Sequence, residues 1–214
     1  MDRRQVPADN VWFPAEVDED TAVHVIASYF QLNAHNYEHR ALVLAKKHHA
    51  NLYDDNLASY AANGNFCSPR STPCMPGGPV LVIPSDLGLL DQAIRLADGQ
   101  ILGVREYTSG SMSGWAAATG ALNLATNKRD ADVPDDVRQI LMDLKREGNN
   151  GYRIPKKGTA YKAMVELHIR ELKKRGYSGD FVAGYLVGSG LRGDRGENLT
   201  RIYGNLNNPP TRRS

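Results

Sequence analysis

The chain has 214 residues, 41% of them hydrophobic, so it can form one domain with a sizeable core. Its 26 basic and 24 acidic residues leave a net charge of +2, so no overall field favours nucleic acid as a partner. No stretch approaches the roughly 18 consecutive apolar residues of a membrane span. The first residues also lack the apolar core of a signal peptide. We therefore predict a soluble, cytoplasmic chain.

Residues 1–17 are predicted to be irregular, because Pro7 and Pro14 interrupt regular structure. Asp18 or Asp20 then suits the N-cap of a long helix that reaches about residue 50. Apolar side chains along this stretch recur every three, four or seven residues, as they do on one face of a helix.

Residues 61–79 are a loop by composition, since glycine, proline, serine and asparagine are frequent in them. This loop holds both cysteines of the chain, Cys67 and Cys74. Their spacing matches no zinc or redox motif, so a disulfide and two free thiols are both open.

Residues 80–107 allow two interpretations. Residues 80–83 and 101–107 resemble short strands, and the segment between them resembles a helix, which together would make one β-α-β unit. Because a lone unit cannot make a sheet, one bent helix from about residue 85 to 107 is the alternative.

Three helices are predicted in the rest of the chain. Trp115 opens a helix of small residues, Pro134 starts a helix to about residue 147, and residues 159–175 form a strong helix that Gly176 ends. We expect an all-α fold, a bundle of about six helices.

One helical domain over residues 18–205 would be followed by a mobile basic tail over residues 206–214. A sheet built from residues 80–83 and 101–107 would refute the all-α expectation.

The turn before the helix at 159–175 is the most distinctive segment. Its glycines allow backbone to approach a ligand, and its cations suit a phosphate-rich cofactor with a flat ring. These residues are Lys145, Arg146, Gly148, Gly151, Tyr152, Arg153, Lys156, Lys157 and Gly158. A solvated basic loop between two helices is the alternative.

This turn, GYRIPKKG preceded by LKREGNN, resembles the cytoplasmic cofactor loop of the steroid 5α-reductase family. Other segments are similar to motifs of that family and follow the same order along the chain. They are WFPAE (12–16), NYEHRALV (36–43), DGQILG (98–103), SGW (113–115), Glu171 with the later Gly176 and Tyr177, and Leu191 with Arg192.

The resemblance implies an NADPH-dependent reductase that transfers hydride to the β-carbon of a 3-oxo-4-ene steroid. An acid at the carbonyl oxygen lowers the barrier of such a reaction. Glu16 and Tyr37 match the family's positions for this task and are expected to face one apolar cavity. The alternatives are a solvated loop acid for Glu16 and a core aromatic for Tyr37.

The resemblance also implies which residues would hold NADPH: Lys145, Tyr152, Arg153, Glu171 and Arg192, with Asn123 and Asn127 as an amide pair. Lys145 replaces an arginine of the family, and lysine cannot hold a phosphate in the bidentate way of arginine. That family spans membranes, whereas this chain is polar where lipid-facing residues belong. An engineered analogue or inactive soluble scaffold with the same helical fold is therefore the alternative function.

A second alternative is a zinc metallopeptidase. His35, Glu38 and His39 form the pattern H-x-x-E-H, in which two histidines on one helix face bind zinc beside a glutamate base. A polar helix surface is the simpler interpretation of the same residues.

Overall fold

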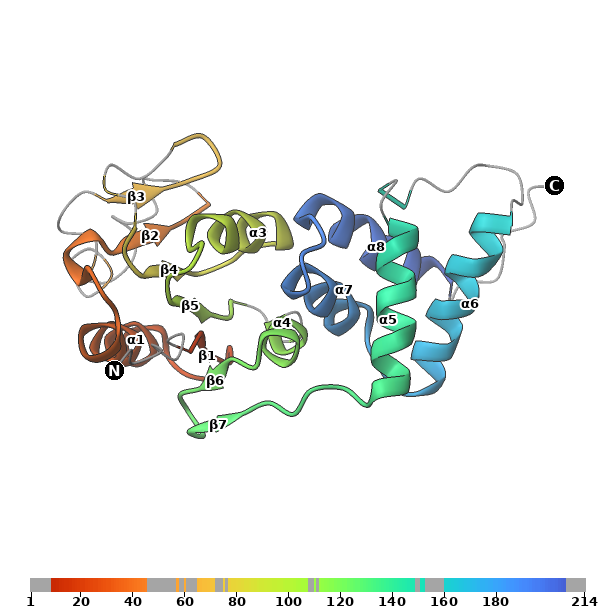
Figure 1. Ribbon diagram of the computed structural model, residues 1–214, viewed down its shortest axis with the longest axis horizontal. Helices are drawn as coiled ribbons and strands as arrows, with labels where there is room; N and C mark the ends of the chain where they lie inside the picture. Colours follow the sequence, from red (N-terminus) through yellow and green to blue (C-terminus); the bar gives the residue numbers. More distant parts are fainter. Residues whose placement is uncertain are drawn as a thin grey trace, which may run out of the picture.

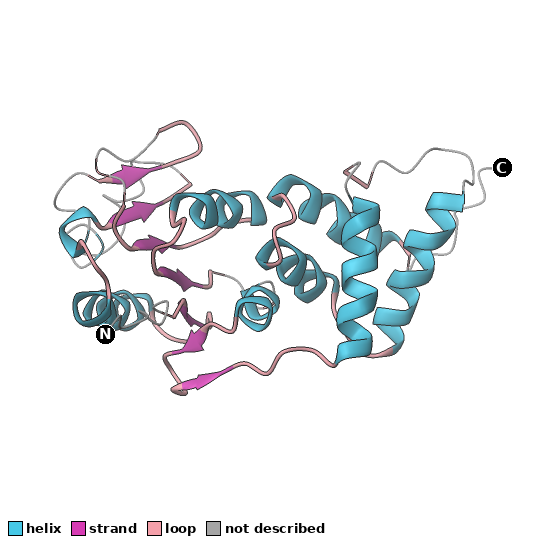
Figure 2. Ribbon diagram, in the orientation of Figure 1, coloured by secondary structure: helices cyan, strands magenta, loops and turns pink. Residues whose placement is uncertain are grey.

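The computed structural model describes residues 9–45, 57, 60, 65–71, 75, 77–107, 110, 112–148, 151–152 and 160–206. A sheet with its covering helices lies at one end of the molecule, and further helices extend to the other end (Figure 1, Figure 2).

The described residues form one sheet with the strand order β3-β2-β4-β5-β1-β6-β7. Neighbouring strands are parallel except for β6 and β7, which are antiparallel. The strands are β1 (Val11–Phe13), β2 (Ala41–Val43), β3 (Phe66–Cys67), β4 (Val80–Val82), β5 (Leu102–Arg105), β6 (Leu122–Asn123) and β7 (Lys128–Arg129).

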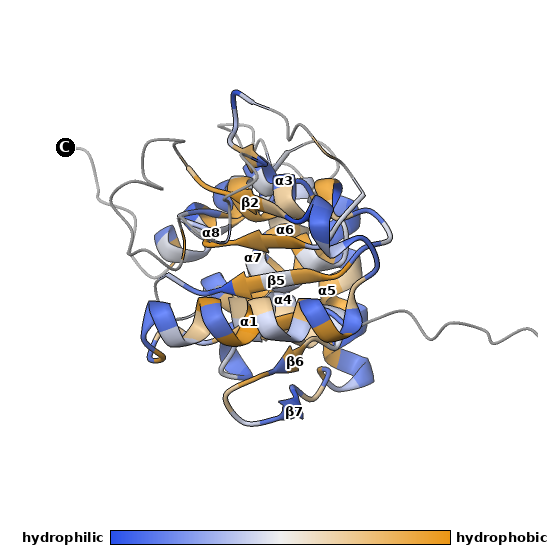
Figure 3. Cartoon of the chain, turned by 90° about the vertical axis from the view of Figure 1, so that its left-hand side faces the viewer, coloured by the Kyte–Doolittle hydropathy of each residue, from blue (hydrophilic) through white to orange (hydrophobic). Residues whose placement is uncertain are grey.

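The central strands are short apolar runs because helices cover both faces of the sheet. Every residue of β1, β2, β4 and β5 is buried, which is typical of parallel strands between two helical layers. At the edge, by contrast, β7 consists of two exposed cations, which discourage pairing with another chain (Figure 3).

Helix α1 (Glu19–Asn33) covers one face of the sheet, and Asp18 caps its first turn by accepting a hydrogen bond from the Thr21 amide at 2.9 Å. A Cβ atom on Gly103 of β5 would come within 2.6 Å of Ile26 and 2.7 Å of Phe30. The glycine therefore allows α1 to lie this close to the strand.

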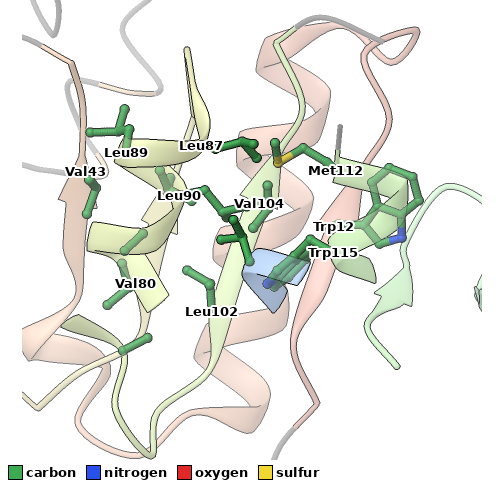
Figure 4. Close-up of a cluster of buried hydrophobic side chains, with 14 of the residues drawn as sticks. Trp12, Val43, Val80, Leu87, Leu89, Leu90, Leu102, Val104, Met112 and Trp115 are labelled. Atoms are coloured by element: carbon green, nitrogen blue, oxygen red, sulfur yellow. The ribbon is translucent and has the colours of Figure 1, made fainter. Parts of the chain in front are cut away.

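Helices α3 (Leu87–Leu96) and α4 (Met112–Thr119) cover the opposite face. Figure 4 shows Leu102 and Val104 of β5 in one core cluster with Leu90 of α3 and Trp115 of α4. Burial of such large apolar side chains is the main stabilising contribution to a core of this kind.

In the described part of the chain four further helices follow: α5 (Asp135–Glu147), α6 (Ala160–Lys174), α7 (Gly179–Gly188) and α8 (Gly193–Asn205). Residues 182–187 of α7 are all buried, because α7 lies between α4 and the outer helices (Figure 1). None of the described helices combines the length and the apolar composition needed to cross a bilayer.

The predicted all-α fold is wrong, since the described residues form an α/β structure. Residues 80–82 and 102–105 pair as parallel strands with α3 between them, so the β-α-β interpretation was the right one. Its lone unit becomes part of a sheet because β1, β2, β3 and β6 supply further parallel strands from segments predicted to be irregular, loop or helical.

The predicted helix from about residue 20 to 50 ends at Asn33. Asn36 adopts a left-handed conformation with φ of 54°, and the short 3-10 helix η1 (Tyr37–His39) leads into β2. The segment 1–17 contains β1. In contrast, α5 and α6 confirm the helices predicted over 134–147 and 159–175. Residues 207–214 of the predicted tail lie outside the described residues.

Candidate functional site

In α/β proteins, ligands commonly bind at the carboxyl edge of the parallel sheet, where neighbouring strands lead to helices on opposite faces. Here β1 leads into α1 on one face, while its neighbour β5 leads into α4 on the other. Side chains that follow β1 and β5 therefore meet at this edge.

Arg105, the last residue of β5, is only 8% exposed and organises the turn after β1. Its guanidinium donates to the carbonyl oxygens of Val17 at 3.0 Å and Ala15 at 3.5 Å, and also to that of Glu106. These bonds hold residues 15–17 in place at the start of α1, so Arg105 has a structural role here.

Glu106 is 3% exposed and closes the start of α4. One carboxylate oxygen accepts hydrogen bonds from the amides of Gly110 at 2.9 Å and Met112 at 3.0 Å. An anion at a helix N-terminus is stabilised by the unpaired amides and by the helix dipole. The position that a ligand phosphate would take is thus held by the protein's own carboxylate.

The same arrangement recurs at α3. Asp86 accepts from the Leu89 amide at 2.8 Å, and Glu197 of α8 accepts from the Gly88 amide at 3.3 Å. With Asp18 at α1, each helix that directly follows β1, β4 or β5 begins against an internal carboxylate.

The acidic turn of α1 adds to this negative character. Burial raises the pKa of the Glu19 carboxyl, while the Arg105 charge opposes that rise. The hydrogen bonds of the Thr21 side chain and amide lower the pKa of Asp18. A pyrophosphate placed at this edge would meet carboxylates instead of free amides, so the edge does not fit a dinucleotide.

The predicted catalytic residues do not meet. Glu16 precedes the first turn of α1, and Tyr37 follows its last turn, so a helix of 15 residues, about 22 Å long, lies between them. Tyr37 instead stacks with Arg40, whose guanidinium carbon lies 4.7 Å from the ring centre. Since Glu16 and Tyr37 lie at opposite ends of a helix, they cannot polarise one carbonyl together.

Three predicted cofactor residues do lie near one another, at the junction of α5, α7 and α8. The Lys145 ammonium donates to the Ser189 carbonyl, and the Tyr152 hydroxyl donates to the Leu144 carbonyl at 2.8 Å. Arg192 pairs with Asp194 at 3.1 Å. Burial raises the pKa of Tyr152, whose side chain is only 3% exposed. These groups bond to helix ends and close neighbours, as structural residues do.

The remaining predicted cofactor residues lie elsewhere. Glu171 of α6 pairs with Arg175, the residue after the end of this helix, at 2.9 Å. Asn123 is the last residue of β6, and Asn127 lies in the turn between β6 and β7. The Asn123 side chain accepts a hydrogen bond from the Ala125 amide at 3.0 Å. Arg153 lies outside the described residues. The described part of the predicted set does not form one NADPH site.

The structure also bears on the predicted zinc pattern and on the cysteine pair. His35 lies in a bend and His39 in η1, so the two histidines do not share an α-helix face, and the described residues contain no group of three metal-binding side chains. Cys67 is a buried free thiol beside Gln92, and burial raises its pKa. Cys74 lies outside the described residues.

A groove of about 530 Å³ lies between the α6–α7 turn and α8, away from the sheet edge. Its described lining carries hydroxyl, phenol, ammonium and carboxylate groups and includes three glycines, of which Gly176 and Gly204 leave open space. The described lining residues are Lys173, Gly176, Tyr177, Ser178, Gly179, Asp180, Thr200, Tyr203 and Gly204. The volume lies in the range of small-molecule sites.

Local structure explains how this groove forms. Gly176 takes a left-handed conformation with φ of 86°, and the Tyr177 amide bonds to the Leu172 carbonyl at 3.1 Å, which ends α6 sharply. Ser178 then caps α7 by accepting from the Phe181 amide at 3.1 Å. The chain thus reverses within a few residues and leaves an open side facing α8.

Tyr203 of α8 lines the groove and is held in place by its neighbours. Its hydroxyl donates to the Tyr177 carbonyl at 2.5 Å, and the Lys173 ammonium lies 4.7 Å above its ring while donating to its carbonyl at 2.5 Å. Burial raises the pKa of Tyr203 to about 12 and lowers that of Lys173. The phenol therefore stays protonated at neutral pH.

No pattern in the sequence predicted this groove, although Gly176 and Tyr177 belong to the segments that carry the family resemblance. The available signal was Gly204, a glycine in a helical segment. Arg105 and Glu106 were missed too; their signal was a charged pair directly after an apolar run. No protein-family model, curated protein or solved structure matches this chain.

Proposed function

We propose that the chain is a small-molecule-binding α/β protein whose ligand occupies the groove between the α6–α7 turn and α8. The observation that carries this proposal is Gly204. A Cβ atom at this position would meet nothing within 4 Å, so packing does not require a glycine there.

Gly204 lies in the last turn of α8, one residue before its end, and glycine favours a helical conformation less than alanine does. Gly204 has no compensating left-handed conformation, and it lines the groove. No packing contact explains this glycine, but a ligand that approaches the α8 backbone at this point would explain it.

The carboxyl edge of the sheet is a less suitable ligand site than the groove. At that edge Asp18, Asp86 and Glu106 cap the N-termini of α1, α3 and α4. The groove, in contrast, has open space beside Gly176 and Gly204. NADPH-dependent steroid reduction stays a prediction of the sequence resemblance, and the placement of Glu16 and Tyr37 gives it no geometric support.

A fragment screen by ligand-observed NMR tests the proposal. We expect hits that are lost in Gly204→Leu, whose side chain would project into the groove, and kept in Leu32→Ala, a change at an exposed α1 position. Hits that bind equally to Gly204→Leu, or no hits at all, would contradict it.

A further inference from the structure

Building on the proposed function, we infer that the ligand of this groove is a saccharide or a similar uncharged polyol. Among the described residues, six polar side chains line the groove: Lys173, Tyr177, Ser178, Asp180, Thr200 and Tyr203. Their charges, their hydrogen bonds and the shape of the groove indicate the ligand class.

The charges of the groove are balanced. Among the described residues that line it, Lys173 and Asp180 are charged, and their charges are opposite. Each would attract a charge that the other repels, so the pair favours neither an anion nor a cation. A neutral polar ligand fits this balance and can accept hydrogen bonds from the ammonium and donate them to the carboxylate.

Hydroxyl groups that line the groove can still form hydrogen bonds with a ligand. Thr200 already donates to the Gly196 carbonyl at 3.3 Å, and the Tyr203 hydroxyl donates to the Tyr177 carbonyl, so both oxygens offer lone pairs to a ligand. Ser178 accepts from the Phe181 amide and keeps its own hydrogen to donate. Ligand hydroxyls both donate and accept, so they match this mixed set.

The shape of the groove also bears on the ligand class. The exposed glycines at positions 176 and 204 have no atom within 4 Å of a built Cβ, so at these two lining positions the backbone is open to a ligand. The Tyr177 ring supplies an apolar wall beside it, packed at 5.2 Å from the Phe181 ring. A sugar ring presents hydroxyls at its rim and C–H groups on its face, which suits polar sides and one apolar wall.

Saturation-transfer-difference NMR tests the inference with maltose, cellobiose and N,N′-diacetylchitobiose, beside sodium benzoate and benzylamine as charged probes. We expect transfer to at least one disaccharide and none to the charged probes. Gly204→Leu should weaken disaccharide binding at least tenfold while the Tm stays unchanged or rises, since leucine favours a helix more than glycine does.

Asp180→Ala should also weaken disaccharide binding, by at least fivefold. Asp194→Ala is its matched control, because Asp194 holds the same second position in α8 after an identical Gly-Asp start. We expect Asp194→Ala to bind like the unchanged chain, since Asp194 does not line the groove.

The outcomes separate this inference from the function on which it rests. Binding of benzoate or benzylamine, lost in Gly204→Leu, would overturn the saccharide assignment and leave the groove as the site. Disaccharide binding that survives Gly204→Leu would overturn the assignment of this groove. If no probe and no fragment binds, both proposals fail.

Discussion

Gly114 of α4 touches the backbone of α7 so closely that a Cβ atom on it would fall 2.0 Å from the Phe181 carbonyl oxygen. The same Cβ atom would lie 2.7 Å from the Tyr185 amide nitrogen. This contact joins the sheet and its covering helices to the outer helices. Because α7 also starts at the groove, the contact fixes where the groove wall lies.

Gly114→Ala should lower the free energy of unfolding by about 1–3 kcal/mol, since an added methyl group must push two packed helices apart. Urea denaturation followed by circular dichroism measures the effect. Gly204→Ala is the matched control, because open space surrounds it, and it should leave stability unchanged or raise it. Equal stability of the two variants would contradict the close packing described.

Glu106→Leu should lower the free energy of unfolding by about 1–3 kcal/mol, because it leaves the part-buried Gly110 amide and the buried Met112 amide without an acceptor. Glu106→Gln keeps an acceptor oxygen and should cost less. Thermal unfolding of both variants provides the comparison. A leucine variant as stable as the glutamine variant would show that the carboxylate does not cap α4.

Acid should weaken the link between the start of α5 and the end of α6. A hydrogen bond from Arg175 lowers the pKa of Asp136, so this interaction stabilises the fold above the ordinary aspartate pKa and is lost as pH falls through the lowered value. Unfolding midpoints in urea at neutral pH and below about pH 4 should therefore differ less in Asp136→Asn than in the unchanged chain. Identical acid sensitivity would mean that the pair contributes nothing.

Lys145→Met tests the structural role of a residue that the sequence predicted to bind cofactor. Loss of its bond to the Ser189 carbonyl should cost about 1 kcal/mol of stability. NADPH fluorescence titration should show no saturable binding by either the variant or the unchanged chain. Saturable binding that Lys145→Met abolishes would restore the cofactor interpretation of the loop.

The sequence predicts α5 and α6 well and the sheet poorly, for one physical reason. In α5, Val137, Leu141 and Leu144 are buried at helical spacing, and periodicity of this kind is visible in a single sequence. Strands such as Ala41–Val43 are buried on both faces, so they show no alternation and are too short to stand out.

The groove was hidden for a related reason. Its residues come from α6, the α6–α7 turn and α8, and no local pattern shows that Tyr177 and Gly204 lie at one groove. Individual caps were easier, since Asp18 was predicted as a possible N-cap and does cap α1. Side chains whose role depends on a neighbour close in sequence can be predicted; those that meet only through the fold cannot.

Backbone amide chemical-shift mapping of the isotope-labelled chain with the disaccharide panel tests the central claim most directly. We predict saturable shifts at Gly176, Ser178 and Gly204. We predict none at Gly99, which precedes the amino end of β5, or at Glu106, which follows its carboxyl end. Shifts confined to Glu106 and its neighbours would place the ligand at the sheet edge instead and contradict the account.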